Sequence, residues 1–274
     1  MKQNLHTHTL WCDGSNEAEE MIVRAMEKGF SSLGFSSHTF TGFPFDSCGI
    51  STKEKEEEYI SSLENLREKY RSEIEIFIGL EEESRKEGTL EPTINLRLDY
   101  SIGSVHWFWI NGKPFSVDYT AEQFRSAKEE AGSLMALIEG YYGEVMRFAS
   151  FSPYSITGHF DLVTKFVEKE GWSFEEEKWY KDISLSALDY VIEKGKVLEV
   201  NTGAISRGLR TSPYPSRFLL ERAKEKNAPI VITTDCHNKD YLDLYFIEAK
   251  KILEAIGFKE IQILTRNGFK GEKL

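Results

Sequence analysis

Short apolar segments alternate with longer, charged and amphipathic segments along most of this sequence. The apolar segments have the length and composition of β-strands, and the segments between them have the periodicity of helices. Strands that alternate with helices favour a parallel sheet, either doubly wound or closed into a barrel. No Pro/Gly-rich linker divides the 274 residues, so we expect a single α/β domain over residues 1–274.

The individual elements can be placed from apolar runs and from capping residues. Thr120 and Gln123, for example, resemble a capping box that opens a long helix. After an N-terminal segment that reads as a strand, further strands are expected at residues 32–38, 75–81, 100–106, 155–159, 196–201, 229–235 and 261–264. Helices are expected at residues 18–29, 53–70, 120–148, 174–193, 216–226 and 239–255.

All six histidines lie at or just beyond the C-terminal end of an expected strand, and three carboxylates occupy equivalent places. Active sites of parallel barrels lie at the C-terminal ends of the strands. Imidazole and carboxylate groups commonly share divalent cations, and nine of them suit two or three ions better than one. The predicted metal ligands are His6, His8, Asp13, His38, Glu81, His106, His159, Asp235 and His237.

These residues form a motif series that resembles the PHP (polymerase and histidinol phosphatase) superfamily from residue 4 to about residue 240. The chain length and three short segments are similar to the stand-alone histidinol-phosphatase branch of that superfamily. The three segments are Ser36-Ser37-His38, Gly158-His159-Phe160-Asp161 and Asn201-Thr202-Gly203.

The resemblance implies a distorted (β/α)7 barrel with up to three metal ions at the C-terminal ends of its strands. It assigns a bridging role to Glu81, which would contact two of the ions. The implied ligand sets are His6, His8, Glu81 and Asp235 for the first ion, Glu81, His106 and His159 for the second, and Asp13, His38 and His237 for the third. Zinc, iron or manganese would fit these ligands.

The chemistry that we expect is metal-dependent hydrolysis of a phosphomonoester, with a metal-bridging hydroxide attacking phosphorus. Arg207 is the first candidate to bind the phosphate and Arg210 the second, because a guanidinium group can clamp phosphate bidentately. Either arginine could instead be an ordinary surface charge. Asp161 could protonate the departing alcohol or orient a ligand histidine.

Four aromatic residues are expected on loops that wall the mouth of the barrel, where they could stack on a substrate ring or simply pack together. Two of them lie in the long loop at residues 39–52 and two follow the fourth histidine of the chain. They are Phe43, Phe45, Trp107 and Trp109.

Composition limits the partners of the chain. The formal charge of −11 and the lack of a basic stripe make nucleic acid an unlikely partner. Three cysteines without paired spacing, no basic-then-apolar leader and no apolar run of membrane-spanning length indicate a cytoplasmic protein. The sequence leaves the oligomeric state open.

The resemblance to the histidinol-phosphatase branch implies hydrolysis of L-histidinol phosphate to L-histidinol and phosphate in histidine biosynthesis. One alternative is a PHP phosphoesterase that acts on phosphotyrosine, a nucleotide or nucleic acid. A non-catalytic metal-binding protein is another, but a structural metal site would not leave coordination positions open.

Overall fold

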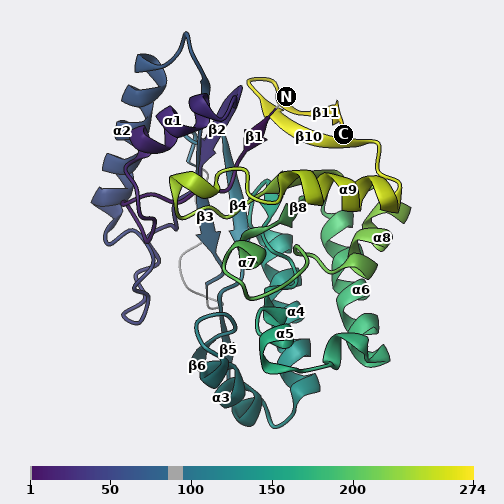
Figure 1. The fold of residues 1–274 in the computed structure, drawn as a ribbon. Coiled ribbons are helices and arrows are strands. Elements are labelled where there is room, and N and C mark those ends of the chain that lie inside the picture. The colour runs from purple at the N-terminus through teal and green to yellow at the C-terminus, as the bar shows by residue number, and fades with distance from the viewer. Residues whose placement is uncertain (1, 86–94) are drawn as a thin grey trace.

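A computed structural model describes residues 2–85 and 95–274 of the chain. Its centre is a sheet of seven strands in which every neighbouring pair runs parallel. At least one helix lies between each pair of successive strands of this sheet except β3 and β4, among the described residues, as Figure 1 shows. In spatial order the strands are β1 (Gln3–Asn4), β2 (Ser32–Phe35), β3 (Glu75–Glu83), β4 (Tyr100–Ser104), β7 (Ile156–Thr157), β8 (Val197–Asn201) and β9 (Ile230–Thr233).

Two backbone hydrogen bonds bring the two edges of this sheet together. The amide of His8 donates to the carbonyl oxygen of Cys236 at 2.8 Å, and the amide of Cys236 donates to the carbonyl oxygen of His6 at 3.1 Å. They form a parallel bridge between Thr7 and Cys236, just beyond the ends of β1 and β9. The sheet is therefore a nearly closed barrel, and the expected distorted (β/α)7 architecture is confirmed.

Helices cover the outside of the barrel and bury apolar stripes against it. In α1 the buried stripe consists of Ala18, Met21, Ile22 and Ala25, which is the spacing of one helix face. Within the described residues, no helix combines the length and the apolar character needed to cross a membrane. The helices are α1 (Ala18–Glu27), α2 (Lys53–Lys69), α3 (Ala121–Ala131), α4 (Leu134–Phe151), α5 (Val167–Glu170), α6 (Lys178–Glu193), α7 (Gly203–Ser206), α8 (Arg217–Glu225) and α9 (Phe246–Ile256).

Apolar side chains fill the N-terminal end of the barrel. The buried cluster there consists of Leu5, Phe77, Tyr100, Ile102, Ile156, Val197, Val231 and Leu264. Leu264 belongs to β10 (Glu260–Thr265), which pairs with β11 (Gly268–Lys273) in a hairpin beside β1 (Figure 1). The side chain of Gln3 holds this hairpin through hydrogen bonds with both the amide and the carbonyl of Leu264. The apolar filling leaves the carboxyl end of the barrel as the place for polar groups.

Two of the predicted helices are interrupted in the structure. The helix predicted at residues 120–148 divides into α3 and α4, because Gly132 adopts a left-handed φ of 82° and Ser133 caps the second helix. The helix predicted at residues 239–255 begins later, as α9, because Tyr245 has a left-handed φ of 62°. The remaining predicted helices agree with the structure to within a few residues.

A second antiparallel hairpin lies where the sequence pattern predicts only loops. It consists of β5 (Trp107–Ile110) and β6 (Lys113–Ser116), which pair in register. Trp107 and Trp109 therefore lie on a strand and not on a loop. In Figure 1 this hairpin and α3 lie at the opposite end of the molecule from β10 and β11.

Gly103 of β4 offers a test of how the barrel packs against its outer layer. A Cβ atom at this position would overlap the ring of Tyr154, which is itself buried. We expect Gly103→Ala to lower the free energy of unfolding by about 1–3 kcal/mol, because a packed core resists added volume.

Gly143→Ala in α4 is the matched control, since its added Cβ would meet no neighbouring described segment within 4 Å. Replacing a helical glycine with alanine should raise stability by about 0.5–1 kcal/mol. Denaturant unfolding of the two variants measures both effects, and equal effects would contradict the packing described above.

Candidate metal centre

The inward-facing residues of several strands change from apolar to ionisable toward the carboxyl end of the barrel. In β3, Phe77 lies in the apolar interior, and Glu81 and Glu83 follow at even spacing on the same face. In β8, Val197 of the interior is likewise followed by Glu199. Because side chains alternate along a strand, the same face of each strand is apolar in the core and ionisable at the mouth of the barrel.

Glu81 lies at the centre of the ionisable cluster and is only 1% exposed. Its Oε1 atom lies 3.0 Å from Nε2 of His159 and 3.5 Å from Nε2 of His106. Its Oε2 atom lies 3.1–3.4 Å from ring nitrogens of three other residues, His6, His8 and His38. The two oxygens therefore face separate sets of imidazoles, as the oxygens of a carboxylate that bridges two metal ions would.

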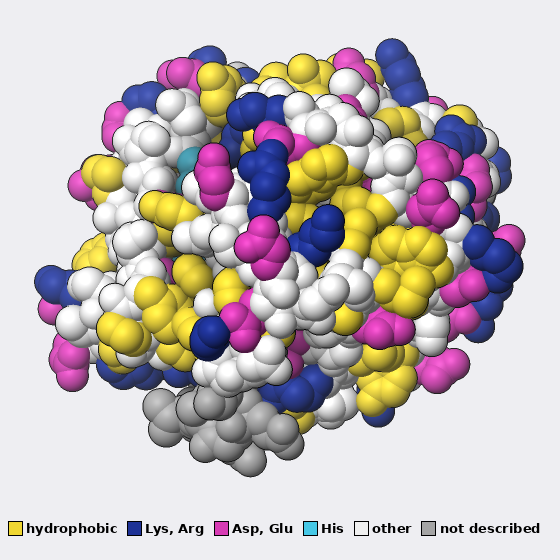
Figure 2. Space-filling view, turned by 90° about the horizontal axis from the view of Figure 1, so that it is seen from below, with side chains coloured by type: hydrophobic (Ala, Val, Ile, Leu, Met, Phe, Trp, Pro, Cys, Tyr) yellow, Lys and Arg dark blue, Asp and Glu magenta, His cyan; other side chains and the backbone are white. Residues whose placement is uncertain are grey.

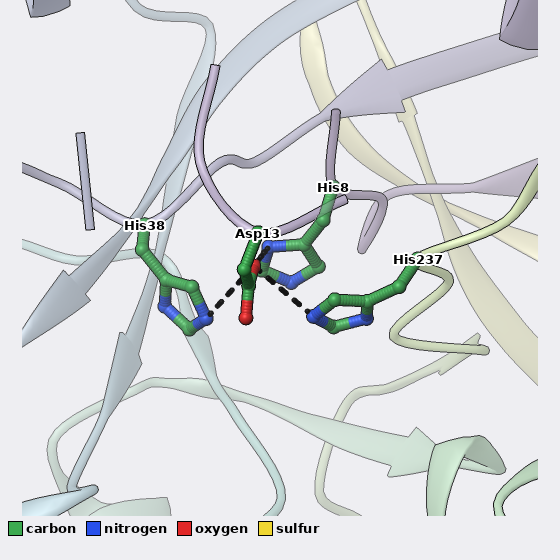
Figure 3. A group of neighbouring side chains, drawn as sticks. All are labelled: His8, Asp13, His38 and His237. Carbon is green, nitrogen blue, oxygen red and sulfur yellow. Dashed lines mark ion pairs between the residues drawn. The ribbon is translucent and has the colours of Figure 1, made fainter. Parts of the chain in front are cut away.

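A second group of ligands surrounds Asp13, which lies between His38 and His237 in Figure 3. Oδ1 of Asp13 is 3.3 Å from Nε2 of His237, 3.7 Å from Nδ1 of His8 and 3.8 Å from Nε2 of His38. Asp235 connects this group to the deeper one, because its Oδ1 lies 3.3 Å from Nε2 of His8 and 3.5 Å from Nδ1 of His237. All nine predicted ligand side chains thus meet in one cluster.

The donor atoms of this cluster fit divalent metal ions. Nε2 of His6, Nε2 of His8 and Oε2 of Glu81 are buried and make no hydrogen bond with any described residue. Buried polar atoms of this kind are costly unless a partner such as a cation satisfies them. The atoms that lie within 4.8 Å of one another form the groups His8–Asp13–His38–His237, His6–His8–Glu81, His6–His159–Asp235 and His38–Glu81–His106. Glu81 belongs to two groups, as a bridge requires, and the division of the ligands among three ions stays a prediction.

The protonation of the cluster is set by burial and by the mutual proximity of its members. Burial and the nearby rings of His237 and His38 lower the pKa of His8 to about 3, so this imidazole is neutral. Burial alone would raise the pKa of Glu81, but the imidazoles of His6 and His38 hold it well below its usual range. The surrounding carboxylates raise the pKa of His6 despite its burial, so a cation that binds His6 must displace a proton.

Two further carboxylates hold ligand histidines from behind, and the sequence motifs do not reveal either of them. Glu199 lies 2.5 Å from Nδ1 of His6, and Glu83 lies 2.7 Å from Nδ1 of His106. A carboxylate at the second ring nitrogen orients a ligand imidazole and fixes its tautomer. The alternation of the strand is a signal that could have identified Glu83, since it lies two residues beyond Glu81.

The cluster opens into a cleft of about 700 Å³ at the carboxyl end of the barrel. The loop at residues 39–52 and the β5–β6 hairpin meet at this cleft. The rings of Phe45 and Trp107 lie 4.6 Å apart and line it, and the rings of Phe43 and Trp109 lie 5.4 Å apart. Figure 2 shows this end of the molecule, where a histidine side chain is visible in a hollow.

The structure separates the two arginines that are predicted to bind phosphate. Arg207 lines the cleft, and its Nη2 atom is 2.8 Å from Oδ2 of Asp235. Arg210 is buried away from the cleft lining, where its guanidinium donates to the carbonyl oxygen of Thr164 at 3.0 Å and to Glu175 at 3.2 Å. Arg207 therefore faces the cleft and Arg210 does not, and phosphate binding by either arginine stays a prediction.

Asp161 also lies apart from the cluster. Its Oδ2 atom accepts hydrogen bonds from the amide and the hydroxyl of Ser216, and it makes none with the ring of His159. The roles of proton donor and histidine partner stay predictions for this residue. The cleft contains instead an ion pair that no sequence motif indicates, between Lys165 and Asp118 at 3.0 Å.

A parallel barrel with imidazole and carboxylate ligands gathered at its carboxyl end defines a class of metal-dependent barrel proteins. The model of one such family, the PHP domain, matches residues 4–203. The chain belongs to the PHP domain family.

Relatives that span nearly the whole chain carry one functional name. The histidinol-phosphatase of Bacillus subtilis is 29% identical over 86% of this chain and 93% of its own, and that of Lactococcus lactis is 26% identical over 99% and 97%. The solved structure of the Lactococcus lactis histidinol phosphate phosphatase, complexed with zinc, L-histidinol and phosphate, superimposes with a TM-score of 0.72 at 21% identity, covering 98% of each chain. A structure from Listeria monocytogenes gives a TM-score of 0.77 at 20% identity, covering 90% and 99%. These two structural likenesses show the shared fold.

Glu81→Gln tests the central position of this carboxylate. The substitution removes the negative charge that faces both sets of imidazoles, so we expect the variant to lose about one bound metal ion or more per chain. Elemental analysis of the dialysed protein measures the loss.

Glu82→Gln is the matched control, because Glu82 is the next residue of β3 and its carboxylate points to Ser152 on the other face of the strand. Its metal content should equal that of the unmodified protein. Equal metal contents of the two variants would rule out the arrangement around Glu81.

Proposed function

We propose that this PHP-family phosphoesterase hydrolyses L-histidinol phosphate to L-histidinol and inorganic phosphate, a reaction of histidine biosynthesis. The hydrolytic function is supported above all by the position of Glu81, whose two oxygens face separate sets of imidazoles at the mouth of the barrel. The substrate is supported by the relatives named histidinol-phosphatase and by the Lactococcus lactis enzyme that holds L-histidinol and phosphate.

The nine ligand side chains would hold about two to three divalent ions, with zinc, iron and manganese as candidates. When bound, such ions lower the pKa of water and neutralise charge on a phosphoryl group. The contribution of the chain is to hold the ligands in place before the substrate arrives, so that little reorganisation accompanies the reaction. Glu81 would set the spacing of two ions because its oxygens belong to one rigid group.

Arg207 is the residue that we propose to bind the phosphoryl oxygens. Asp235 positions its guanidinium through contacts of 2.8 Å to Oδ2 and 3.4 Å to the carbonyl oxygen. A guanidinium has five N–H donors, so others remain for a phosphate in the cleft. Gly203 makes room for this arrangement, because a Cβ atom there would lie 2.9 Å from Nη2 of Arg207.

The cleft suits a small phosphate ester with a ring better than a nucleic acid. Phe45 and Trp107 provide aromatic surface at the cleft, and aromatic faces stack on planar rings. On the described part of the face in Figure 2, basic and acidic side chains are interspersed and form no basic stripe. A stripe of that kind is the usual electrostatic footprint of a nucleic-acid-binding protein.

We propose a cytoplasmic setting for this reaction. All three cysteines, Cys12, Cys48 and Cys236, are free thiols in the structure. Free thiols are typical of proteins in a reducing compartment.

Hydrolysis of a substrate panel tests the proposed function, measured as phosphate release for the monoesters and as nucleotide release for the DNA. The panel contains L-histidinol phosphate, a phosphotyrosine peptide, a nucleoside monophosphate and a short single-stranded DNA. We expect kcat/KM for L-histidinol phosphate to exceed the others by more than about tenfold, because pocket contacts normally discriminate at least this well. A higher kcat/KM for another member would replace histidinol phosphate with that substrate class.

Arg207→Ala should lower kcat/KM by about 10²–10³-fold, because it removes a preorganised donor to the phosphoryl oxygens. Metal analysis of the variant separates this effect from a loss of ions at Asp235, the partner of Arg207. Arg217→Ala is the control, since Arg217 is exposed and pairs only with Glu221 among the described residues. Kinetics of Arg207→Ala that match those of the control would exclude a phosphate contact.

A further inference from the structure

Glu199 lies inside the barrel between the apolar filling and the metal-ligand cluster. It follows Val197 on the inward face of β8, and its side chain is fully buried, with 0% exposure. An ionised carboxylate at such a place requires several hydrogen-bond donors. The structure supplies them from four different residues.

Each oxygen of Glu199 accepts two hydrogen bonds. Oε1 accepts from Nδ1 of His6 at 2.5 Å and from the hydroxyl of Thr233 at 2.7 Å. Oε2 accepts from the amide of His159 at 2.6 Å and from the side-chain amide of Asn201 at 3.0 Å. Glu199 thus contacts the ring of one predicted ligand and the backbone of another.

The contact with His6 determines which of its ring nitrogens can bind a cation. A carboxylate can only accept, so Nδ1 of a neutral His6 must carry the proton that it donates to Glu199. The lone pair then lies on Nε2, the atom that is 3.1 Å from Glu81 and 3.7 Å from Asp235. This is the ring nitrogen of His6 that faces the ligand cluster.

We propose that Glu199 is a positioning residue that holds His6 in the Nδ1–H tautomer and thereby allows Nε2 to bind a metal ion. The carboxylate also accepts a hydrogen bond from the backbone amide of His159. One side chain thus orients two predicted ligands, His6 after β1 and His159 after β7. The proposal rests on the metal-dependent function argued above, but it does not depend on which phosphate ester is the substrate.

A glutamine at this position would reverse the tautomer, because its amide can adopt only one orientation. At the Oε2 position, an NH2 group would face the amide of His159 and the amide of Asn201, which are both donors. The NH2 group must therefore take the Oε1 position and donate to His6 and Thr233. Nδ1 of His6 becomes the acceptor, and the proton moves to Nε2, where it blocks metal binding.

The experiment compares zinc binding by the full-length Glu199→Gln and Thr233→Val variants, measured by competition with a chelating dye. Thr233→Val is the matched control, because it removes one donor from the same oxygen and leaves the carboxylate intact. We expect Glu199→Gln to weaken zinc binding by about 10–100-fold and Thr233→Val to weaken it by less than about threefold. Equal effects of the two variants would overturn the positioning role.

Nitrogen-15 NMR of the zinc-loaded, histidine-labelled protein provides a readout that a merely structural role would not change. The unmodified protein should show a proton on Nδ1 of His6, and Glu199→Gln should show it on Nε2. If Glu199→Gln does not fold, the unmodified protein still decides, because a His6 without a proton on Nδ1 contradicts the proposal. If the unmodified chain fails to hydrolyse histidinol phosphate while the tautomer reverses as expected, the substrate is wrong and the role of Glu199 stands.

Discussion

The buried carboxylate of Glu81 determines how the side chains of the metal centre are arranged. A carboxylate with 1% exposure is stable in its ionised form only if cations or donors surround it. Glu81 has imidazoles around both oxygens, yet its Oε2 and the facing Nε2 atoms of His6 and His8 form no hydrogen bonds among the described residues. This arrangement is what divalent cations would satisfy. The barrel makes it possible, because the apolar filling at its N-terminal end stabilises the fold and leaves the other end free for ligands.

The parts of this site that could be predicted from the sequence depend on local patterns. A histidine or a carboxylate at the end of an apolar run is visible in the sequence, and parallel strands place all such ends at one edge. His106 and His159 can both be placed in this way, although the strand before His159 has only two residues. The same alternation extends to Glu83 and Glu199, which face inward in register with Glu81 and Val197 and yet belong to no motif.

Other features could not be predicted because they depend on distances between remote segments. Arg207 and Arg210 lie three residues apart on one loop, but one faces the cleft and the other is buried against Glu175. The β5–β6 hairpin is a different case, since Asn111 and Gly112 adopt positive φ angles of 50° and 79° and form the tight turn that an Asn-Gly pair favours. The Asn-Gly pair is visible in the sequence, so this hairpin could have been predicted from it.

Anomalous X-ray diffraction from crystals of the purified protein, at the absorption edge of the metal that it contains, tests the proposed metal centre directly. We expect about two to three anomalous peaks within the cluster, with a separate peak at metal–oxygen bonding distance, about 2.0–2.2 Å, from each oxygen of Glu81. A cluster without peaks, in which Glu81 instead accepts hydrogen bonds directly from protonated imidazoles, would contradict the proposed metal centre.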